Sequence, residues 1–306
     1  MFDESFRTIL FVNPARLSLK NSNLFVQRDG FDDVSLPLND IAYIILESPC
    51  ITLSSALLSK LASSKTILLT CDDNHIINGI FNPYLTHFEV NKIIKLQVSQ
   101  GDAQKSILWQ RIIKSKISNQ AKFISLFDDK ISENLMILQK RVKLSDSQNC
   151  EANAAAIYFK ALFSKDFTRD DLCFINSALN YVYSIIRACL VRDIVSSGLL
   201  PNFGLWHDSV YKQFNLADDL MEPFRIYADR LIYSMMNDSK DIFLDTRDKQ
   251  IMIGILDTKV MMGNKSFTLA MSSRVCVQSY KHAILSGENS LDLTEFVLWS
   301  RLCEQW

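Results

Sequence analysis

Two glutamates and one histidine, on three separate segments of the chain, are the side chains best suited to chemistry. Glu151 follows Cys150 in a stretch of small residues that leaves a carboxylate unobstructed, His207 ends the motif Gly-Leu-Trp-His, and Glu222 precedes Pro223. Each has an ordinary explanation when taken singly. An acid in the first turn of a helix complements the helix dipole by about 0.3–1 kcal/mol, and a lone loop histidine is a weak motif.

The segment around Glu222 is the least ordinary of the three. Asn215 can cap a helix, with Asp218 and Asp219 in its first turn. Asp218 and Glu222 are four residues apart and share a face, where two desolvated carboxylates about 4 Å apart repel by roughly 4 kcal/mol. A cation or an arginine would remove that conflict, whereas a solvated acidic helix start would need neither. Pro223 lacks a backbone donor and should break the helix directly after Glu222.

Taken together, Glu151, His207 and Glu222 predict a metal centre. Two carboxylates with one imidazole suit Mg²⁺ or Mn²⁺, and Mn²⁺ tolerates the imidazole better. Such an ion polarises a phosphoryl oxygen and stabilises the attacking or leaving oxygen, which is phosphodiester chemistry. The sequence contains no phosphate-binding Gly-x-x-x-x-Gly-Lys loop, no Gly-x-Ser-x-Gly elbow and no His-Glu-x-x-His helix.

Basic residues supply the candidate contacts to phosphate. Between residues 91 and 122 a single acid, Asp102, accompanies seven cations: Lys92, Lys95, Lys105, Arg111, Lys114, Lys116 and Lys122. This run either follows a phosphate backbone or forms a solvated helix face. Nearer the acidic segments lie three candidate phosphate contacts: Arg187, Arg192 and Arg225. They could equally neutralise Asp218 or Asp219, or lie on the surface.

Hydrophobic periodicity predicts an α+β fold, with a small N-terminal β-rich domain at residues 1–84 and a larger all-helical domain at residues 85–306. Short β-branched runs predict strands at 8–12, 17–20, 24–27, 34–38, 41–46, 66–70 and 76–81, with one helix at 53–61. Apolar spacing of three and four residues predicts helices at 89–98, 105–126 and 132–142. A Thr168-x-x-Asp171 capping box should open a long helix that ends at Gly198 and Pro201. Tyr181 and Tyr183 fall on its apolar face.

Composition excludes several classes of protein. A formal net charge of -1 over 306 residues gives no global attraction to nucleic acid or anionic membranes, so any such binding must be local. The seven cysteines are scattered and include no Cys-x-x-Cys pair, which excludes a zinc ribbon or disulfide framework. With no signal peptide and no long apolar run, we expect a soluble, cytoplasmic protein that does not contact a membrane.

Three motifs resemble those of the CRISPR-associated integrase that installs new spacers. The stretch from Leu179 to Ala188 resembles its "LNYxYxxxRA" pattern, and the motifs at residues 198–207 and 214–225 follow in the family's order. The detailed match runs from about Glu151 to Arg225, and the spacing resembles that of compact members found beside the RNA-guided nuclease. Two positions depart from the pattern of many relatives: Trp206 replaces a second histidine, and Val182 replaces a glycine.

The resemblance implies that Glu151, His207 and Glu222 bind the metal. From their places in the basic run and the acidic segment, Asp218, Asp219, Lys114 and Lys116 are further candidate DNA-binding or supporting residues. It implies a homodimer formed through the N-terminal domains. Two such dimers and a dimer of a small second adaptation protein would form a heterohexamer that binds prespacer duplex and repeat array. The RNA-guided effector nuclease is a further expected partner. The expected reaction is transesterification by a DNA 3′-hydroxyl. A nuclease acting on branched or repair DNA, and a non-catalytic DNA scaffold, are the alternatives; the intact Glu, His and Glu set argues against the scaffold.

Overall fold

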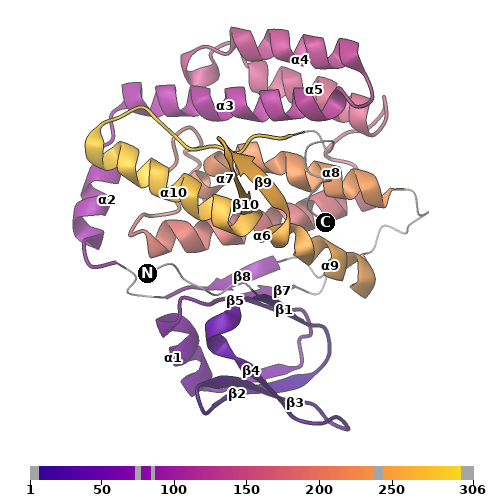
Figure 1. Cartoon of the computed structure of the whole chain (residues 1–306), viewed down its shortest axis with the longest axis vertical. Helices are drawn as coiled ribbons and strands as arrows, with labels where there is room; N and C mark the ends of the chain where they lie inside the picture. Colours follow the sequence, from indigo (N-terminus) through magenta and orange to yellow (C-terminus); the bar gives the residue numbers. More distant parts are fainter. Residues whose placement is uncertain (1–6, 73–76, 84–86, 237–243, 298–306) are drawn as a thin grey trace. The chain divides into compact units, whose positions relative to one another are not determined.

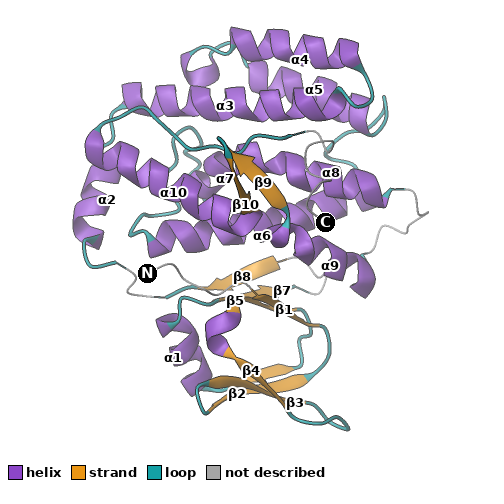
Figure 2. Cartoon of the chain, viewed as in Figure 1, coloured by secondary structure: helices purple, strands orange, loops and turns teal. Residues whose placement is uncertain are grey.

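The computed structural model describes residues 7–72, 77–83, 87–236 and 244–297, and it forms two compact units, Met1–Phe88 and Glu89–Trp306. The first unit is rich in β-strands and the second is mostly helical (Figures 1 and 2), which confirms the predicted α+β fold class. The expected domain junction at residues 84 and 85 lies outside the described residues.

The N-terminal unit contains two four-stranded sheets and one helix. In the first sheet the strand order is β1-β5-β7-β8, with β8 antiparallel to three parallel strands, and in the second it is β4-β3-β2-β6. The elements are β1 (Arg7–Phe11), β2 (Ala15–Lys20), β3 (Asn23–Gln27), β4 (Val34–Pro37), β5 (Ile41–Leu46), β6 (Ile51–Leu53), α1 (Ser55–Ser63), β7 (Ile67–Cys71) and β8 (Ile77–Phe81).

The predicted hairpin in this unit is confirmed. Strands β2 and β3 pair antiparallel around Asn21 and Ser22, whose φ angles of 51° and 62° are those of a tight hairpin turn. The six residues of β5 are all buried, as expected for an apolar central strand. Leu57 and Leu61, four residues apart on α1, pack into the apolar core of the unit.

The second unit is built from helices α2 (Val90–Val98), α3 (Asp102–Ile124), α4 (Asp129–Arg141), α5 (Cys150–Leu162), α6 (Phe174–Ser196), α7 (Asn215–Met221), α8 (Arg225–Met235), α9 (Thr246–Ile253) and α10 (Leu269–Ser286). Helices α3, α4 and α5 pack against one another, and α6 packs against α7, α8, α9 and α10. The prediction of an all-helical domain is wrong at one place, because β9 (Lys259–Met262) and β10 (Lys265–Thr268) form an antiparallel hairpin. These two strands contain too few β-branched residues for their sequence to predict the hairpin.

Helix α6 is the core of this unit. Tyr181 and Tyr183 are both buried, as predicted. The helix is long and apolar enough to cross a membrane by composition alone, but 78% of its most apolar window is buried inside the protein.

The predicted start of α6 is wrong. It begins at Phe174, and Asp171 instead accepts a hydrogen bond from the Thr168 amide within the preceding turn, while Leu172 is 90% exposed. A side chain that caps a local turn of the chain can also serve a helix, so the motif alone does not distinguish the two. The end is as predicted, with Gly198 at a φ of 82°.

Candidate active site

Glu151 lies in the first turn of α5, and a buried aspartate fixes that turn. The two carboxylate oxygens of Asp146 accept hydrogen bonds from the amides of Cys150 and Glu151, at 2.9 and 2.8 Å. These amides belong to the free donors at a helix start, so the carboxylate satisfies them and complements the dipole. The backbone of Glu151 is therefore anchored, while its side chain stays 31% exposed.

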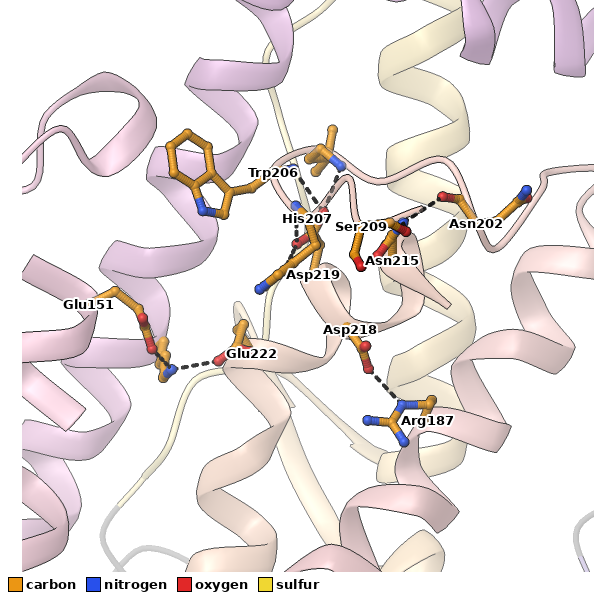
Figure 3. Close-up of polar contacts among 12 residues, drawn as sticks. Glu151, Arg187, Asn202, Trp206, His207, Ser209, Asn215, Asp218, Asp219 and Glu222 are labelled. Atoms are coloured by element: carbon orange, nitrogen blue, oxygen red, sulfur yellow. Dashed lines mark hydrogen bonds and ion pairs between the residues drawn. The ribbon is translucent and has the colours of Figure 1, made fainter. Parts of the chain in front are cut away.

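Glu222 lies at a break between two helices, as Pro223 predicts. Helix α7 ends at Met221, residues Glu222–Phe224 form one 3₁₀ turn, and α8 starts at Arg225. The glutamate is buried at this break. Asn215 does not cap α7 as expected. It is the first helical residue, and its amide nitrogen donates instead to the carbonyls of Asn202 and Ser209 (Figure 3), which holds the preceding loop.

Asp219 organises the loop that carries His207. Its Oδ2 accepts hydrogen bonds from the amides of Leu205 and Trp206, at 2.6 and 2.9 Å, and its Oδ1 accepts one from the amide of His207 at 3.3 Å. A Cβ added to Gly204 would lie 2.3 Å from the His207 carbonyl oxygen and 2.7 Å from Asp219 Oδ2. The glycine in Gly-x-x-His is therefore required by the close approach of loop and carboxylate.

The same aspartate orients the imidazole. Nδ1 of His207 lies 2.5 Å from Asp219 Oδ1 (Figure 3), and this hydrogen bond is the main reason why the pKa of His207 is raised. Because the carboxylate is an acceptor, the neutral ring carries its proton on Nδ1 and leaves Nε2 as a lone-pair donor. Metal-binding histidines in proteins are commonly held in this way by a carboxylate.

Lys116 joins the two glutamates. Its ammonium forms ion pairs with Glu151 Oε1 and, at 2.6 Å, with Glu222 Oε2, so the two carboxylates point toward one another across a lysine (Figure 3). Burial lowers the pKa of Lys116, but Glu222 and Glu151 raise it more, so the group stays charged. Unlike the neighbouring Lys114, Lys116 is buried. In this structure Lys116 therefore supports the two glutamates, and a contact of Lys116 with DNA stays a prediction.

The three candidate arginines have different surroundings. Arg225 Nε lies 3.0 Å from Glu222 Oε1, and Arg225 and Lys116 together lower the pKa of Glu222 to about 2 although burial alone would raise it. Arg187 Nε lies 2.6 Å from Asp218 Oδ1. Arg192 is buried on α6. Arg187 thus neutralises Asp218, as one alternative expected, whereas Arg225 pairs with Glu222 and Asp219 pairs with His207. Contacts of these arginines with phosphate stay a prediction.

Asn119 connects α3 to the break at Glu222, and the predictions from sequence missed it. It lies one turn after Lys116, and its amide nitrogen donates to the carbonyls of Pro223 and Thr294, at 3.2 and 3.0 Å. This bond fixes the register of Lys116 against Glu222. A buried amide on an otherwise apolar helix face is the signal that could have indicated it. Asp146 was also missed, because a single acid in a polar loop gives little indication that it will bind the start of a helix.

The residues present fit a divalent cation, although they do not form a complete ligand cluster. Within the described part of the chain, no three His, Cys, Asp or Glu side chains are grouped closely enough to hold a metal ion. Two carboxylates nevertheless converge on one cation, and Glu222 Oε2 is buried without a hydrogen bond of good geometry despite its contact with Lys116. The charge of Glu222 also acts on His207, which lies beside it. The ligand set of Glu151, His207 and Glu222 stays a prediction.

A second feature borders the histidine. Trp206 stacks on Trp109 of α3 with ring centroids 5.9 Å apart, and the ring of His207 meets Trp109 edge-on. Trp109 is buried and Trp206 is 49% exposed. Trp109 therefore packs against one side of the imidazole, and Trp206 covers Trp109.

A basic pocket lies between α3 and the segment that runs from the end of α4 toward α5. It has a volume of about 910 Å³, and its lining includes Lys114, Lys140, Arg141 and Lys143 together with Ser147 and Gln148, but no acidic residue. Ser147 and Gln148 directly precede α5, so the pocket lies close in sequence to the helix start that carries Glu151. An open pocket lined by cations and hydrogen-bonding groups suits a phosphate backbone.

Comparison with known proteins identifies the family. The profile described as CRISPR associated protein Cas1 matches residues 9–253. The chain is 36% identical over 283 residues to a CRISPR-associated endonuclease Cas1 of Neisseria meningitidis serogroup C, which covers 92% of both chains. This chain belongs to the Cas1 family. A second Cas1 endonuclease, from Francisella tularensis subsp. novicida, is 23% identical over 80% of this chain and 83% of its own length.

Solved structures share the fold of this Cas1 protein. A casposase bound to integration product has a TM-score of 0.76 at 19% identity and covers 94% of this chain and 93% of its own. A CAS1 protein from Thermotoga maritima has a TM-score of 0.74 at 14% identity, with coverages of 92% and 97%. A Cas6-RT-Cas1–Cas2 complex has a TM-score of 0.75 at 18% identity, and this chain spans 37% of that longer polypeptide. The suspected family is confirmed, and with it a place among the endonucleases and integrases of CRISPR adaptation.

Proposed function

We propose that this Cas1 protein is a metal-dependent DNA integrase that joins captured duplex DNA to a CRISPR repeat by transesterification. One observation supports this most directly: Glu151 and Glu222 converge on a single cation position, beside a histidine whose tautomer is set by Asp219. A scaffold protein that only bridged DNA would gain nothing from directing two carboxylates, one of them buried, at the same position.

The ion would be Mg²⁺ or Mn²⁺, held by Glu151, Glu222 and Nε2 of His207, and it would stabilise the negative charge that develops on the phosphate oxygens. The protein's own contribution is positioning. Asp219 holds the proton of the neutral His207 ring on Nδ1 and so leaves Nε2 as the metal donor, Asp146 fixes the start of α5, and Arg225 holds Glu222 ionised at neutral pH. A DNA 3′-hydroxyl aligned with the target phosphate then exchanges one phosphodiester for another, and alignment is the main catalytic effect.

The proposed partners follow from the family and its structural relatives. Relatives of this fold occur in a complex with Cas2 and in a casposase bound to integration product. We infer that this chain binds duplex DNA and a small Cas2-like protein, acts in the cytoplasm and forms a homodimer through its β-rich unit. The basic pocket next to α5 supplies the cations that duplex binding needs, since the net charge of -1 does not.

A joining assay tests the reaction. The protein and its Cas2 partner are incubated with Mn²⁺, a supercoiled repeat plasmid and a donor duplex that ends in a 3′-hydroxyl, a 3′-dideoxy or a 3′-phosphate group. Only the 3′-hydroxyl donor should give joined product. Glu222→Gln should abolish joining and retain duplex binding. Joining by blocked donors would refute the mechanism, and cleavage to free ends with every donor would favour the nuclease.

A further inference from the structure

Lys116 occupies the position between the two glutamates that a cation would take. Its side chain is 7% exposed and that of Glu222 is 6% exposed, so this contact lies away from solvent. Two carboxylates and two cations, Lys116 and Arg225, balance there without any metal ion. The charge balance means that the metal-free protein is not left with two unpaired, repelling carboxylates, of which Glu222 is buried.

The geometry differs from that of an ordinary structural ion pair. Arg225 already satisfies Oε1 of Glu222, whereas Oε2 contacts Lys116 at 2.6 Å without hydrogen-bond geometry. Glu151, the other partner of Lys116, is 31% exposed, so the cluster is open to solvent on that side. A hydrated ion can reach this side, and the flexible four-carbon stem of a lysine allows the ammonium to move away.

We propose that Lys116 is an internal cation that holds Glu151 and Glu222 together in the metal-free protein, and that a divalent ion binds there by displacing the ammonium from both carboxylates. This inference rests on the metal role proposed for the same site. A divalent ion beside both cations would leave an excess of two positive charges. Lys116 therefore moves outward, toward the open side where an anionic phosphodiester would bind.

Replacing Lys116 by methionine tests the displacement. Methionine keeps an unbranched apolar stem but removes the charge, and Lys114→Met makes the same change two residues along the helix. Mn²⁺ affinity is measured by titration calorimetry, and melting temperature is measured in EDTA and in Mn²⁺. If nine-tenths or more of the protein holds the ammonium in place, Lys116→Met should bind Mn²⁺ at least about tenfold more tightly than wild type. Lys114→Met should bind as wild type does.

The melting temperatures give an independent readout. In EDTA, Lys116→Met should melt several degrees below wild type, because the glutamates then repel, and Mn²⁺ should restore most of that loss. Adding Glu222→Gln to Lys116→Met should raise the melting temperature in EDTA, since it removes the repulsion. A double variant that melts no higher than Lys116→Met would contradict the inference.

Wild-type protein provides a test that does not depend on the folding of a variant. Lysines are acetylated with a limiting amount of an amine-reactive reagent, with and without Ca²⁺. Mass spectrometry then gives the extent of labelling at each lysine. Ca²⁺ should increase the labelling of Lys116 severalfold and leave that of Lys114 unchanged. Equal labelling of Lys116 in both conditions would overturn the displacement.

The outcomes separate this inference from the proposed function. If wild type binds Mn²⁺, Glu222→Gln does not, and Lys116→Met binds no more tightly than wild type, the metal site stands and the displacement fails. Weaker binding by Lys116→Met would show that the lysine only positions the glutamates, which also overturns the inference. If neither wild type nor Lys116→Met binds Mn²⁺, both the inference and the proposed function fail.

Discussion

Replacing Asp219 by asparagine should invert the tautomer of His207. The carboxylate accepts hydrogen bonds on both oxygens, from two backbone amides on Oδ2 and from His207 on Oδ1. An amide has only one acceptor oxygen. It will keep that oxygen toward the two short backbone bonds, at 2.6 and 2.9 Å, and turn its NH₂ group toward His207. Nδ1 must then accept a hydrogen bond, and the proton of the ring moves to Nε2.

The magnitude follows from the bonds that change. The variant loses the charge-assisted bond to Nδ1, worth about 1.5–3 kcal/mol, and the longer bond from the His207 amide, but gains a neutral bond of about 1 kcal/mol. The free energy of unfolding should therefore fall by roughly 1–3 kcal/mol. Metal binding should weaken by a comparable free energy. Loss of an outer partner of a ligating histidine commonly costs 10–100-fold in affinity, or about 1.4–2.8 kcal/mol.

Three measurements check this argument. Urea unfolding gives stability, calorimetry gives Mn²⁺ affinity, and ¹⁵N chemical shifts of the imidazole report the tautomer. Asp218→Asn makes the same chemical change one residue away, where the partner is Arg187, and should leave the tautomer unchanged. If Asp219→Asn kept its proton on Nδ1 and bound Mn²⁺ as wild type does, the carboxylate would not be what prepares His207.

Three further predictions concern other parts of the helical unit. Burial raises the pKa of Asp229, the acceptor of the Tyr183 hydroxyl, to about 6, above its value in the unfolded chain. The folded protein thus holds this proton more tightly, and this group should lower the free energy of unfolding by about 2 kcal/mol between pH 4 and pH 6. Urea unfolding of Asp229→Asn should show a decline smaller by that amount, and an identical pH profile would contradict the prediction. Reversing Lys114 and Lys143 to Glu should lower the slope of log affinity against log salt for duplex DNA by about 2, as judged by fluorescence anisotropy, whereas Lys265→Glu should not change it. Asp146→Ala should cost about 1–2 kcal/mol in urea unfolding, because the first turn of α5 loses its two side-chain acceptors, and no loss would show that water replaces the cap.

The sequence predicted the elements whose signals are local. Apolar periodicity located β2, β3, β5 and most helices, and the missing backbone N–H of Pro223 predicted a helix break next to Glu222. The predictions from sequence were wrong where the same short motif can either cap a helix or stabilise a loop. Thr168 and Asp171 form a turn rather than a helix start, and Asn215 binds loop carbonyls rather than capping α7. In both cases the side chain found a partner that only tertiary structure supplies.

In the candidate site, too, some residues could be predicted from local sequence and others could not. The types of residue that bind Mg²⁺ or Mn²⁺ are few, so residue type and motif sufficed to select Glu151, His207 and Glu222 as candidates. Lys116 could not be separated from its basic neighbours, because its partners are 35 and 106 positions away along the chain. Lys114 and Lys116 are two positions apart on α3 and so face different surfaces, and only the packing of α3 against α5 and the break at Glu222 selects the lysine that is buried.

Several polar side chains are buried in this unit because they hold the backbone next to the three candidate ligands. Asp146, Asp219 and Asn119 each bond to backbone groups beside a ligand, and each is buried. Hydrogen bonds to backbone fix the position of a loop or helix end more closely than apolar contacts do, because they are directional. A reaction that depends on alignment loses rate steeply when its groups shift by about 1 Å. Buried polar anchors on α3, α7 and the turn before α5 therefore serve the geometry of the site, and their loss should reduce joining more than it reduces stability.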